Sequence, residues 1–454
     1  MRRTTVGFVV LSVLALVVAL GWTGRATAEP LSLDSLQKPA ATAADQIPEE
    51  INTAMGKLYK GDVDGALADM KAAAAKYPHL PPAEVIMGQI FARAGQIGQA
   101  RMWLERAIVE TPNDPESYVM LGQLALQNKQ FAEARLLFEK AQQTLAGFNS
   151  NPKRKESLQA TTSRQLAALA MARKDLDTAT GHLNELLKLR ANDADGLQLL
   201  ARLLYDQEKP LEALDKLKLA KKSNKDLLTP EAILAQWYEE SKDHANATKY
   251  MTIALETAPR DFMTRLEAAK WAFGAELFKQ SAEQAGFALQ LAQQQELDPS
   301  QALVLAGNVA IFQGDYPAAE KHLRAAVALS PATFTATNNL ALALCEQDNK
   351  EKQQLALQYA RINANLYPKQ LEAGSTLGRV LFRLGNYQEA NAIFEKVRGA
   401  GQPLSMDTVY YLADLYAATE RKDEAKKLLK EVVKQEGLFS QRKNAEQLLK
   451  TLGP

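Results

Sequence analysis

Residues 81–114 read PPAEVIMGQIFARAGQIGQARMWLERAIVETPND, and this 34-residue stretch decides the fold because its pattern returns along the chain. Its Ala100 has counterparts 34 residues away on either side, at Ala66 and Ala134. A second triplet has the same step, at Ala179, Ala213 and Ala247. A fixed period of this length indicates that one structural unit has been copied many times.

Each unit carries the pattern of two helices. A large apolar residue follows the recurrent alanine by four positions, as Leu104 follows Ala100, and Ala107 lies three positions further on. Spacings of three and four place side chains on one face of a helix. A second small residue, here Gly88, precedes the alanine by twelve positions and indicates another helix. Small residues at both positions let two helix axes approach closely.

Glycine and proline mark the ends of these helices. Glycine adopts the left-handed conformation that a tight turn between helices uses, and proline cannot continue a helix. Glycines fall between the two helices of a unit at Gly61, Gly95, Gly314 and Gly385, and prolines close units at Pro78, Pro112, Pro259, Pro331 and Pro368. Each unit is therefore predicted to be an antiparallel helix pair that must stack on its neighbours to bury its apolar stripe.

With these features the chain resembles the tetratricopeptide repeat family. The unit from Pro81 to Asp114 carries the family's pattern at Met87, Gly88, Phe91, Gly95, Ala100, Leu104, Ala107 and Pro112. The resemblance implies an all-α fold, a right-handed α-solenoid of about eleven helix pairs with a C-terminal capping helix. Extending the register places unit starts near Ile47, Pro81, Pro115, Ala160, Ala194, Leu228, Phe262, Ser300, Phe334, Leu371 and Met406.

The register also divides the chain into segments. Units 1–3 are predicted over 47–148, a basic insert over 149–159, units 4–11 over 160–438, and a capping helix with a tail over 439–454. We expect the insert to lengthen a loop or a helix on one rim. Two units depart from the pattern: Ser281 stands where the recurrent alanine belongs, and about three extra residues lie between Asp348 and Gln354.

Residues 1–28 have the parts of a secretory signal peptide. A basic start is followed by an apolar run over 6–22 and an Ala-Thr-Ala ending, which predicts cleavage after Ala28. The alternative is an uncleaved anchor, because an apolar run of this length can approach a membrane span. Residues 29–46 lack a sustained period and are expected to form a flexible leader. We therefore expect an exported protein of the periplasm or cell envelope.

A search for catalytic chemistry finds no motif with the required spacing. The histidines are far apart, and none stands four residues from another or beside a cysteine, which is the spacing of metal ligands. The sequence contains no nucleophile elbow and no Gly-rich phosphate loop. Cys345 is the single cysteine, so no intramolecular disulfide is possible. We interpret it as a packed or groove-edge thiol, with a reactive thiol as the alternative. We expect no enzyme activity, no cofactor and no metal site.

The charge balance disfavours nucleic acid as a partner. The 54 basic and 53 acidic residues leave a net charge of +1. Basic clusters, for example over 153–155 and 426–434, are interpreted as helix-end charges that suit the helix dipole. An anionic partner for these clusters is the alternative.

The resemblance also implies where a partner binds. In the family, the first helices of successive units line a concave groove, and six positions of each helix point inward toward an extended peptide or a partner's helix. Mapping those positions gives candidate partner-binding residues at Gln89, Arg93, Gln123, Gln127, Arg164, Gln198, Arg202, Gln236, Asn308, Asn338, Asn339, Arg379, Arg383, Tyr410 and Tyr411. The set is rich in amides, which both donate and accept and can therefore satisfy a peptide backbone without reading its sequence.

Two clusters within this set are of particular interest. Asn308 and Asn339 repeat a pairing with which peptide-binding members of the family clamp a terminal carboxylate, although the cations that complete the clamp are missing here. Arg379 and Arg383 flank Phe382 and offer guanidinium groups suited to a carboxylate or an acidic segment, with surface solubility as the alternative role.

The sequence thus predicts a non-catalytic exported scaffold that mediates protein–protein interaction through its groove. The expected partners are proteins or peptides, without nucleic acid, and with membrane contact only through an uncleaved N-terminal segment. The alternative is an accessory protein of envelope polysaccharide or protein secretion or assembly machinery.

Overall fold

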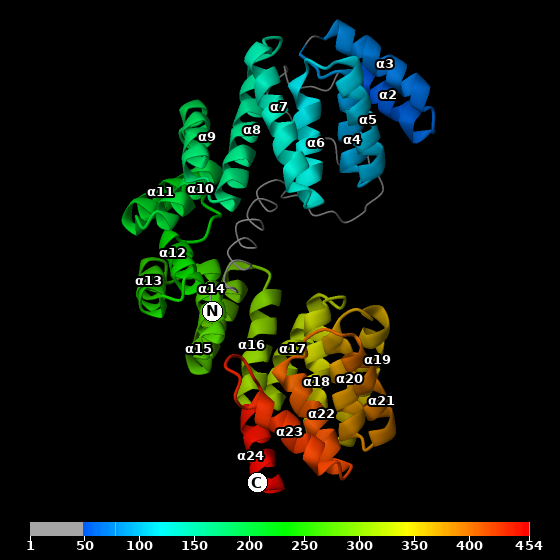
Figure 1. The fold of residues 1–454 in the computed structure, drawn as a ribbon, viewed down its shortest axis with the longest axis vertical. Coiled ribbons are helices and arrows are strands. Elements are labelled where there is room, and N and C mark those ends of the chain that lie inside the picture. The colour runs from blue at the N-terminus through cyan, green and yellow to red at the C-terminus, as the bar shows by residue number, and fades with distance from the viewer. Residues whose placement is uncertain (1–48, 78, 454) are drawn as a thin grey trace. The chain divides into compact units, whose positions relative to one another are not determined.

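The computed structural model describes residues 49–77 and 79–453, all of whose regular secondary structure is helical. The predicted signal peptide (1–28) and leader (29–46) lie outside the described residues. The chain divides into two compact units, Met1–Pro230 and Glu231–Pro454, called unit 1 and unit 2 below and described separately. Figure 1 labels their helices.

Unit 1 consists of antiparallel helix pairs over its described residues. In chain order these are α2 (Glu49–Tyr59) with α3 (Val63–Lys76), α4 (Ala83–Arg93) with α5 (Ile97–Glu110), α6 (Pro115–Gln127) with α7 (Phe131–Gly147), α8 (Pro152–Ala172) with α9 (Leu176–Leu189), and α10 (Ala194–Asp206) with α11 (Pro210–Ser223). The second helix of each pair packs against the first helix of the next pair, so the apolar faces are buried by stacking.

Unit 2 continues the alternation and ends in an unpaired helix. It contains α12 (Pro230–Glu240), which begins at the last residue of unit 1, α13 (His244–Thr257), α14 (Phe262–Gly274), α15 (Phe278–Gln295), α16 (Ser300–Gln313), α17 (Tyr316–Leu329), α18 (Phe334–Cys345), α19 (Lys350–Leu366), α20 (Leu371–Arg383), α21 (Tyr387–Gly399), α22 (Met406–Ala418), α23 (Lys422–Val432) and α24 (Arg442–Leu452). The final helix, α24, packs on α22 and α23. The predicted all-α architecture of helix pairs closed by a C-terminal helix is confirmed.

The small residues of the repeat mark the closest approach of the paired helices. Ala100 and Ala134 are fully buried, and a Cβ atom built on Gly122 would lie 2.8 Å from the Phe138 ring. Ser281 replaces the recurrent alanine and is also fully buried, but its hydroxyl donates a hydrogen bond to the carbonyl oxygen of Ala269 at 2.7 Å. This bond to the facing helix satisfies the buried hydroxyl, so the departure in sequence leaves the packing intact.

The turn inside each pair keeps one backbone conformation whatever residue occupies it. Gly61 and Gly95 have φ values of 83° and 72°, and Lys129, at the equivalent position of the next pair, has φ of 60°. In each case the following residue donates its N–H to a carbonyl five residues back, for example Gln130 to Ala125 at 2.8 Å. This pattern ends a helix with a left-handed residue, and the sequence predicted it only where glycine is present.

The basic insert lengthens a helix. Residues 152–159 form the first two turns of α8, which is 21 residues long. Asn151 caps this helix by accepting the N–H of Arg154 at 3.0 Å, and its own side-chain amide donates to the carbonyl oxygen of His79 at 2.9 Å. The insert therefore reaches back along unit 1. None of the helices in the described part of the chain combines the length and apolar character needed to cross a membrane.

Candidate functional site

The candidate partner-binding residues all lie on the first helix of a pair. In unit 1, α6 contacts α8 and α8 contacts α10, and in unit 2 the helices α14, α16, α18, α20 and α22 contact one another in that order. First helices of successive pairs therefore lie side by side, and Figure 1 shows this row within unit 2. We call this the first-helix face of each unit.

In unit 1, one carboxylate gathers an amide and a cation from neighbouring pairs. Gln89 Nε2 donates to Glu116 Oε1 at 2.6 Å, and Arg154 Nε donates to the other oxygen at 2.5 Å. Arg154 also pairs with Asp114 (Nη2 to Oδ1, 2.6 Å), and its side chain is only 12% exposed. Burial by itself would lower the pKa of Arg154, but the two carboxylates outweigh it and the pKa is raised. The insert residue Arg154 is thus tied into the face.

The other candidate arginines on the last two first helices of unit 1 are also held by carboxylates of their own chain. Arg164 Nη2 pairs with Asp193 Oδ2 at 2.6 Å, and Arg202 Nε pairs with Asp206 Oδ1 at 3.1 Å. Arg202 is buried, contrary to the expectation that it faces an open groove. These ion pairs reduce the net charge that the face of unit 1 offers to a ligand.

The remaining candidates of unit 1 are more accessible. Arg93 and Gln127 are exposed, and Gln123 is half-buried. Gln198 is half-buried as well, and its Nε2 lies 3.4 Å from the carbonyl oxygen of Ala194 in the same helix. These side chains leave hydrogen-bonding groups at the surface of the first-helix face.

In unit 2, the first candidate amide is engaged by a neighbouring carboxylate. Gln236 Nε2 donates to Glu267 Oε2 at 3.0 Å, and Lys270 donates to the other oxygen, Oε1, at 2.6 Å. Lys270 also donates to Gln301 Oε1 at 3.2 Å. An amide, a carboxylate and an ammonium group therefore alternate along α12, α14 and α16.

Three asparagines on α16 and α18 form a chain of side-chain amides. Asn338 Nδ2 donates to Asn339 Oδ1 at 3.3 Å, and Asn339 Nδ2 donates to Asn308 Oδ1 at 2.8 Å. Asn308 and Asn339 are half-buried, whereas Asn338 is 6% exposed and its Oδ1 is buried without a hydrogen-bond partner. The buried amide holds the two accessible amides in a fixed orientation. We call these three residues the asparagine chain.

Arg379 is the centre of a buried ionic cluster, contrary to the expectation that it faces a partner. Its Nε and Nη2 donate to Glu346 at 2.6 and 3.1 Å, and its Nη1 donates to Asp414 at 2.6 Å. Arg379 is 3% exposed. Burial opposes the charge, but Glu346 and Asp414 raise the pKa of Arg379 well above its ordinary value. The guanidinium group thus joins the pairs of α18, α20 and α22 and has no free edge for an external carboxylate.

The neighbouring candidates are engaged by the same cluster. Tyr410 and Tyr411 are buried, and their rings lie 5.7 and 4.9 Å from the Arg379 guanidinium carbon. Arg383 is half-buried, and it donates to Asp348 Oδ1 at 2.9 Å and to the carbonyl oxygen of Cys345 at 3.1 Å. Only the outer edge of Arg383 is open to solvent.

The segment that leads into α24 covers this part of unit 2. Gln441 is 1% exposed, and its side-chain amide donates to the hydroxyl of Tyr316 on α17 at 3.2 Å. Its backbone N–H and the hydroxyl of Ser440 both donate to Asp407 Oδ1, at 3.0 and 2.8 Å. The C-terminal segment therefore helps to exclude water from the ionic cluster, which explains why residues predicted to be open are buried.

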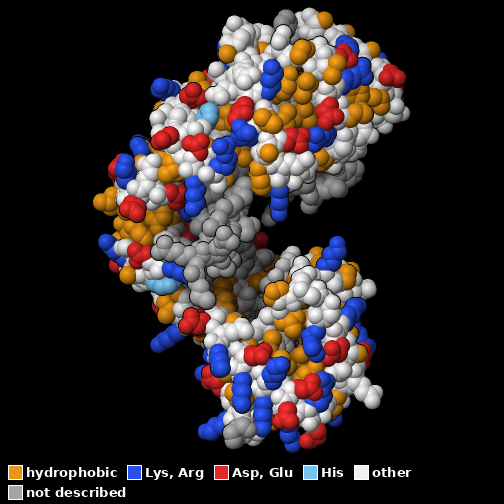
Figure 2. All heavy atoms as spheres, viewed as in Figure 1, with side chains coloured by type: hydrophobic (Ala, Val, Ile, Leu, Met, Phe, Trp, Pro, Cys, Tyr) orange, Lys and Arg blue, Asp and Glu red, His pale blue; other side chains and the backbone are white. Residues whose placement is uncertain are grey.

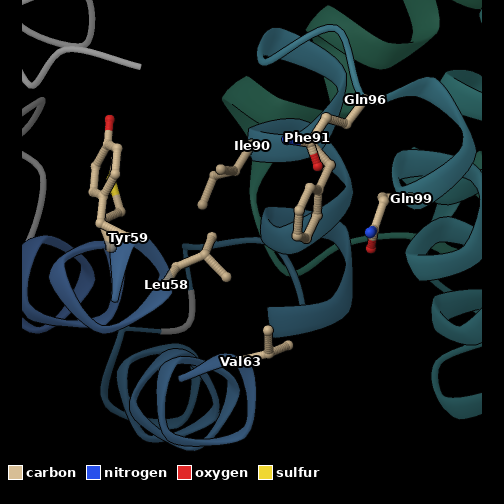
Figure 3. Close-up of a pocket in the computed structure, with 8 residues that line it drawn as sticks. Leu58, Tyr59, Val63, Ile90, Phe91, Gln96 and Gln99 are labelled. Atoms are coloured by element: carbon tan, nitrogen blue, oxygen red, sulfur yellow. The ribbon is translucent and has the colours of Figure 1, made fainter. Parts of the chain in front are cut away.

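An apolar pocket of about 330 Å³ lies between the first two helix pairs of unit 1. Leu58 from α2 and Ile90 from α4 point toward one another, with Phe91 beside them (Figure 3). The rest of the lining consists of Met55, Tyr59, Val63, Gln96 and Gln99. A pocket with an apolar floor and two amides at its edge suits an apolar side chain on a polypeptide. We call it the first-junction pocket.

Sequence reasoning missed the acidic members of these clusters. Glu116, Glu267, Glu346 and Asp414 stand at inward positions of their own units, as the candidate amides and cations do. Mapping carboxylates in the same register would have identified them. Their positions beside Gln89, Gln236 and Arg379 depend on the stacking of units and cannot be read from one unit alone.

The surface and the side-chain groupings give no sign of other chemistry among the described residues. Basic and acidic side chains are interspersed over each unit on the face that Figure 2 shows. Within residues 49–77 and 79–453, no group of three or more His, Cys, Asp or Glu side chains is placed to hold a metal ion. Hydrogen bonding by amides is the chemistry that the first-helix faces present.

Comparison with known proteins identifies the repeats. A family model described as Tetratricopeptide repeat matches residues 52–115, 87–150 and 304–366, and a second model of the same description matches 381–449. Together these matches cover just over half of the chain. No curated protein matches the sequence.

Several solved structures are similar in fold at low identity. Yeast Tom70 is 15% identical with a TM-score of 0.35, and the match covers 89% of this chain and 95% of that one. The APC/C hetero-tetramer Cut9-Hcn1 is 13% identical with a TM-score of 0.39, covering 88% of each chain. A repeat protein from Parabacteroides merdae is 14% identical with a TM-score of 0.37, covering 65% of this chain and 99% of that one. These values carry no argument about partners.

Proposed function

Because the chain belongs to the tetratricopeptide repeat family, we propose that it is a non-catalytic, exported scaffold that binds a protein partner along the first-helix face of unit 2. The asparagine chain is the proposed contact for the partner's backbone. Repeat solenoids of this kind offer extended surfaces for polypeptides.

The observation that carries this proposal is the unpaired buried oxygen of Asn338. A buried acceptor without a hydrogen bond costs about 1–3 kcal/mol, so the arrangement is not accounted for by stability. Asn338 uses its amide group to hold Asn339, and Asn339 in turn holds Asn308. The cost is explained if the fixed orientation of the two outer amides serves recognition.

The electrostatics of both faces favour a polypeptide over a polyanion. Arg154, Arg164 and Arg379 are each paired with carboxylates of their own chain. A polyanion needs unpaired cations, whereas a peptide backbone needs one donor and one acceptor per residue. Asn308 and Asn339 supply both kinds of group from accessible positions.

A double substitution tests the contact. Asn308→Ala with Asn339→Ala is compared with wild type and with a matched control, Gln290→Ala with Gln294→Ala, two exposed amides on the second helix α15. Each protein is expressed in its own cell envelope and cross-linked there, and captured proteins are identified by mass spectrometry. We expect the wild type and the control to capture the same partner and the asparagine variant to lose it. Equal capture by all three contradicts the proposal.

Export is the second part of the proposal, and the predicted signal peptide motivates it. N-terminal sequencing of the protein from an envelope fraction is expected to read from Glu29. A cytoplasmic protein that retains residues 1–28 contradicts this part without affecting the binding test. Capture of a polysaccharide synthase or a secretin would favour the alternative role in envelope secretion or assembly.

A further inference from the structure

The first-junction pocket is specific to one place in the repeat array. Leu58, Tyr59 and Phe91 line it, and Ala92, Arg93 and Ala125 stand at the equivalent positions of the next junction. Large apolar side chains therefore replace two alanines and an arginine where the first pair meets the second. Tyr59 is 44% exposed, so the pocket presents apolar surface to solvent.

A segment of the same chain, close to the pocket in sequence, has matching chemistry. Residues 31–36 read Leu-Ser-Leu-Asp-Ser-Leu, with three leucines inside an otherwise polar stretch. We propose that residues 31–36 occupy the first-junction pocket, with the leucines against its apolar floor. The segment lies outside the described residues, and α2 begins 13 residues after Leu36.

The chain is long enough for this contact. Thirteen residues span up to about 43 Å when extended. The 11-residue helix α2, which the segment must pass to reach Leu58 and Tyr59, is about 16 Å long. A tether of this length holds the segment at an effective concentration on the order of millimolar, so even a weak contact is formed in most molecules.

The charges beside the pocket also match. Lys60 and Arg93 follow the lining residues Tyr59 and Phe91 by one and two positions, and both are exposed. Neither forms an ion pair within the described residues. Asp34 stands between two of the leucines of the segment and supplies a carboxylate to this edge. The pocket would thus be closed in cis, and a partner's apolar segment would have to displace residues 31–36.

Cysteine cross-linking in the full chain tests the contact. Leu36→Cys is combined with Gln96→Cys at the edge of the pocket, and the control combines Leu36→Cys with Gln130→Cys, the equivalent exposed position one unit further on. Both engineered positions in the repeats are exposed, so folding is not put at risk. Cys345 is buried and stays in place. Under mild oxidation we expect the first pair to form an intramolecular disulfide at least tenfold faster than the control pair.

A further substitution separates specific docking from chance encounter. Leu33→Asp, added to the Leu36→Cys and Gln96→Cys pair, is expected to slow the disulfide to the rate of the control pair. Equal rates for the test and control pairs overturn the proposal. A disulfide that forms only between two molecules also overturns it and assigns the pocket to a second copy. None of these outcomes bears on the asparagine chain, which lies in unit 2.

Discussion

Arg379 on α20 makes a two-bond ion pair with Glu346, the residue that ends α18, and both side chains are almost completely buried, at 4% and 7% exposed. The pair joins two successive helix pairs, and Asp414 extends it to a third. A planar guanidinium group suits this geometry because it can donate in two directions at once.

Removal of one member of this pair is expected to destabilise unit 2. Arg379→Met leaves the Glu346 carboxylate buried without its partner, which costs about 3–5 kcal/mol. The control is Arg361→Met, because the exposed pair of Arg361 with Glu389 contributes about 0–1 kcal/mol. Urea unfolding followed by circular dichroism measures both. Equal losses in the two variants would show that the buried pair has no special role.

Two glycine substitutions are expected to change stability in opposite directions. A Cβ atom at Gly122 would lie 2.8 Å from the Phe138 ring, so Gly122→Ala overpacks the pair and costs about 1–3 kcal/mol. Gly181 lies inside α9 with no atom within 4 Å of such a Cβ, so Gly181→Ala stabilises the helix by about 1 kcal/mol. Thermal unfolding distinguishes the two signs, and a gain in stability for Gly122→Ala would contradict the close approach seen here.

Asn338→Leu is expected to raise stability while it lowers partner binding. The substitution removes the unpaired buried oxygen, which adds about 1–3 kcal/mol to the free energy of unfolding. It also removes the donor that fixes Asn339. The measurements are the urea midpoint and the yield of captured partner from the envelope. A variant that is more stable and still binds fully would separate Asn338 from recognition.

The pH dependence of stability is expected to change in Asp407→Asn. Burial raises the pKa of Asp407, against the hydrogen bonds from Ser440 and Gln441, which lower it. A carboxyl group with a raised folded-state pKa gives a stabilising contribution that is fully present below its ordinary value of 3.8 and is lost as the pH rises through the folded-state pKa. Asparagine keeps the accepting oxygen and does not titrate.

The stability of Asp407→Asn relative to wild type should therefore increase as the pH rises above 3.8 and then level off. Chemical unfolding at a series of pH values gives this difference directly. Asp423→Asn, which changes an exposed carboxylate on α23, provides the control. A difference that stays constant with pH, or that falls, would mean that Asp407 is not held in an unfavourable environment.

Cys345 is expected to be unreactive in the folded protein. The thiol is fully buried, and burial raises its pKa well above the ordinary value, so the reactive thiolate is scarce. A chromogenic thiol reagent at pH 8 should label Cys345 only in denaturant. It should label an added cysteine at the exposed Gln313 immediately. Rapid labelling of native Cys345 would indicate an open thiol and revive the alternative of a reactive cysteine.

The sequence was sufficient to predict the helix pairs and the terminal helix, because both depend on local spacing. The step of 34 residues, the small residues at the closest approach and the apolar positions four apart are all readable within one unit. Turns were predicted only at glycines, since nothing in the residue type marks Lys129 as left-handed. Its conformation, with φ of 60°, is imposed by the two helices that the turn connects.

The candidate site was predicted correctly in register but only in part in exposure. Asn308 and Asn339 lie accessible on adjacent first helices, as the register implies. Arg379, Tyr410 and Tyr411 occupy the same kind of position and are buried. The difference arises from carboxylates of neighbouring units and from the segment before α24, none of which is visible within the unit that carries these three residues.

By itself, then, the sequence determined the repeating unit, its register and the helices that could face a partner, because periodicity within 34 residues encodes them. The tertiary structure decided which of those side chains remain available. Arg379 meets Glu346 from 33 residues earlier in the chain and Asp414 from 35 residues later, and Gln441 meets Tyr316 across 125 residues. Contacts between units set burial and charge pairing, and a pattern confined to one unit does not contain them.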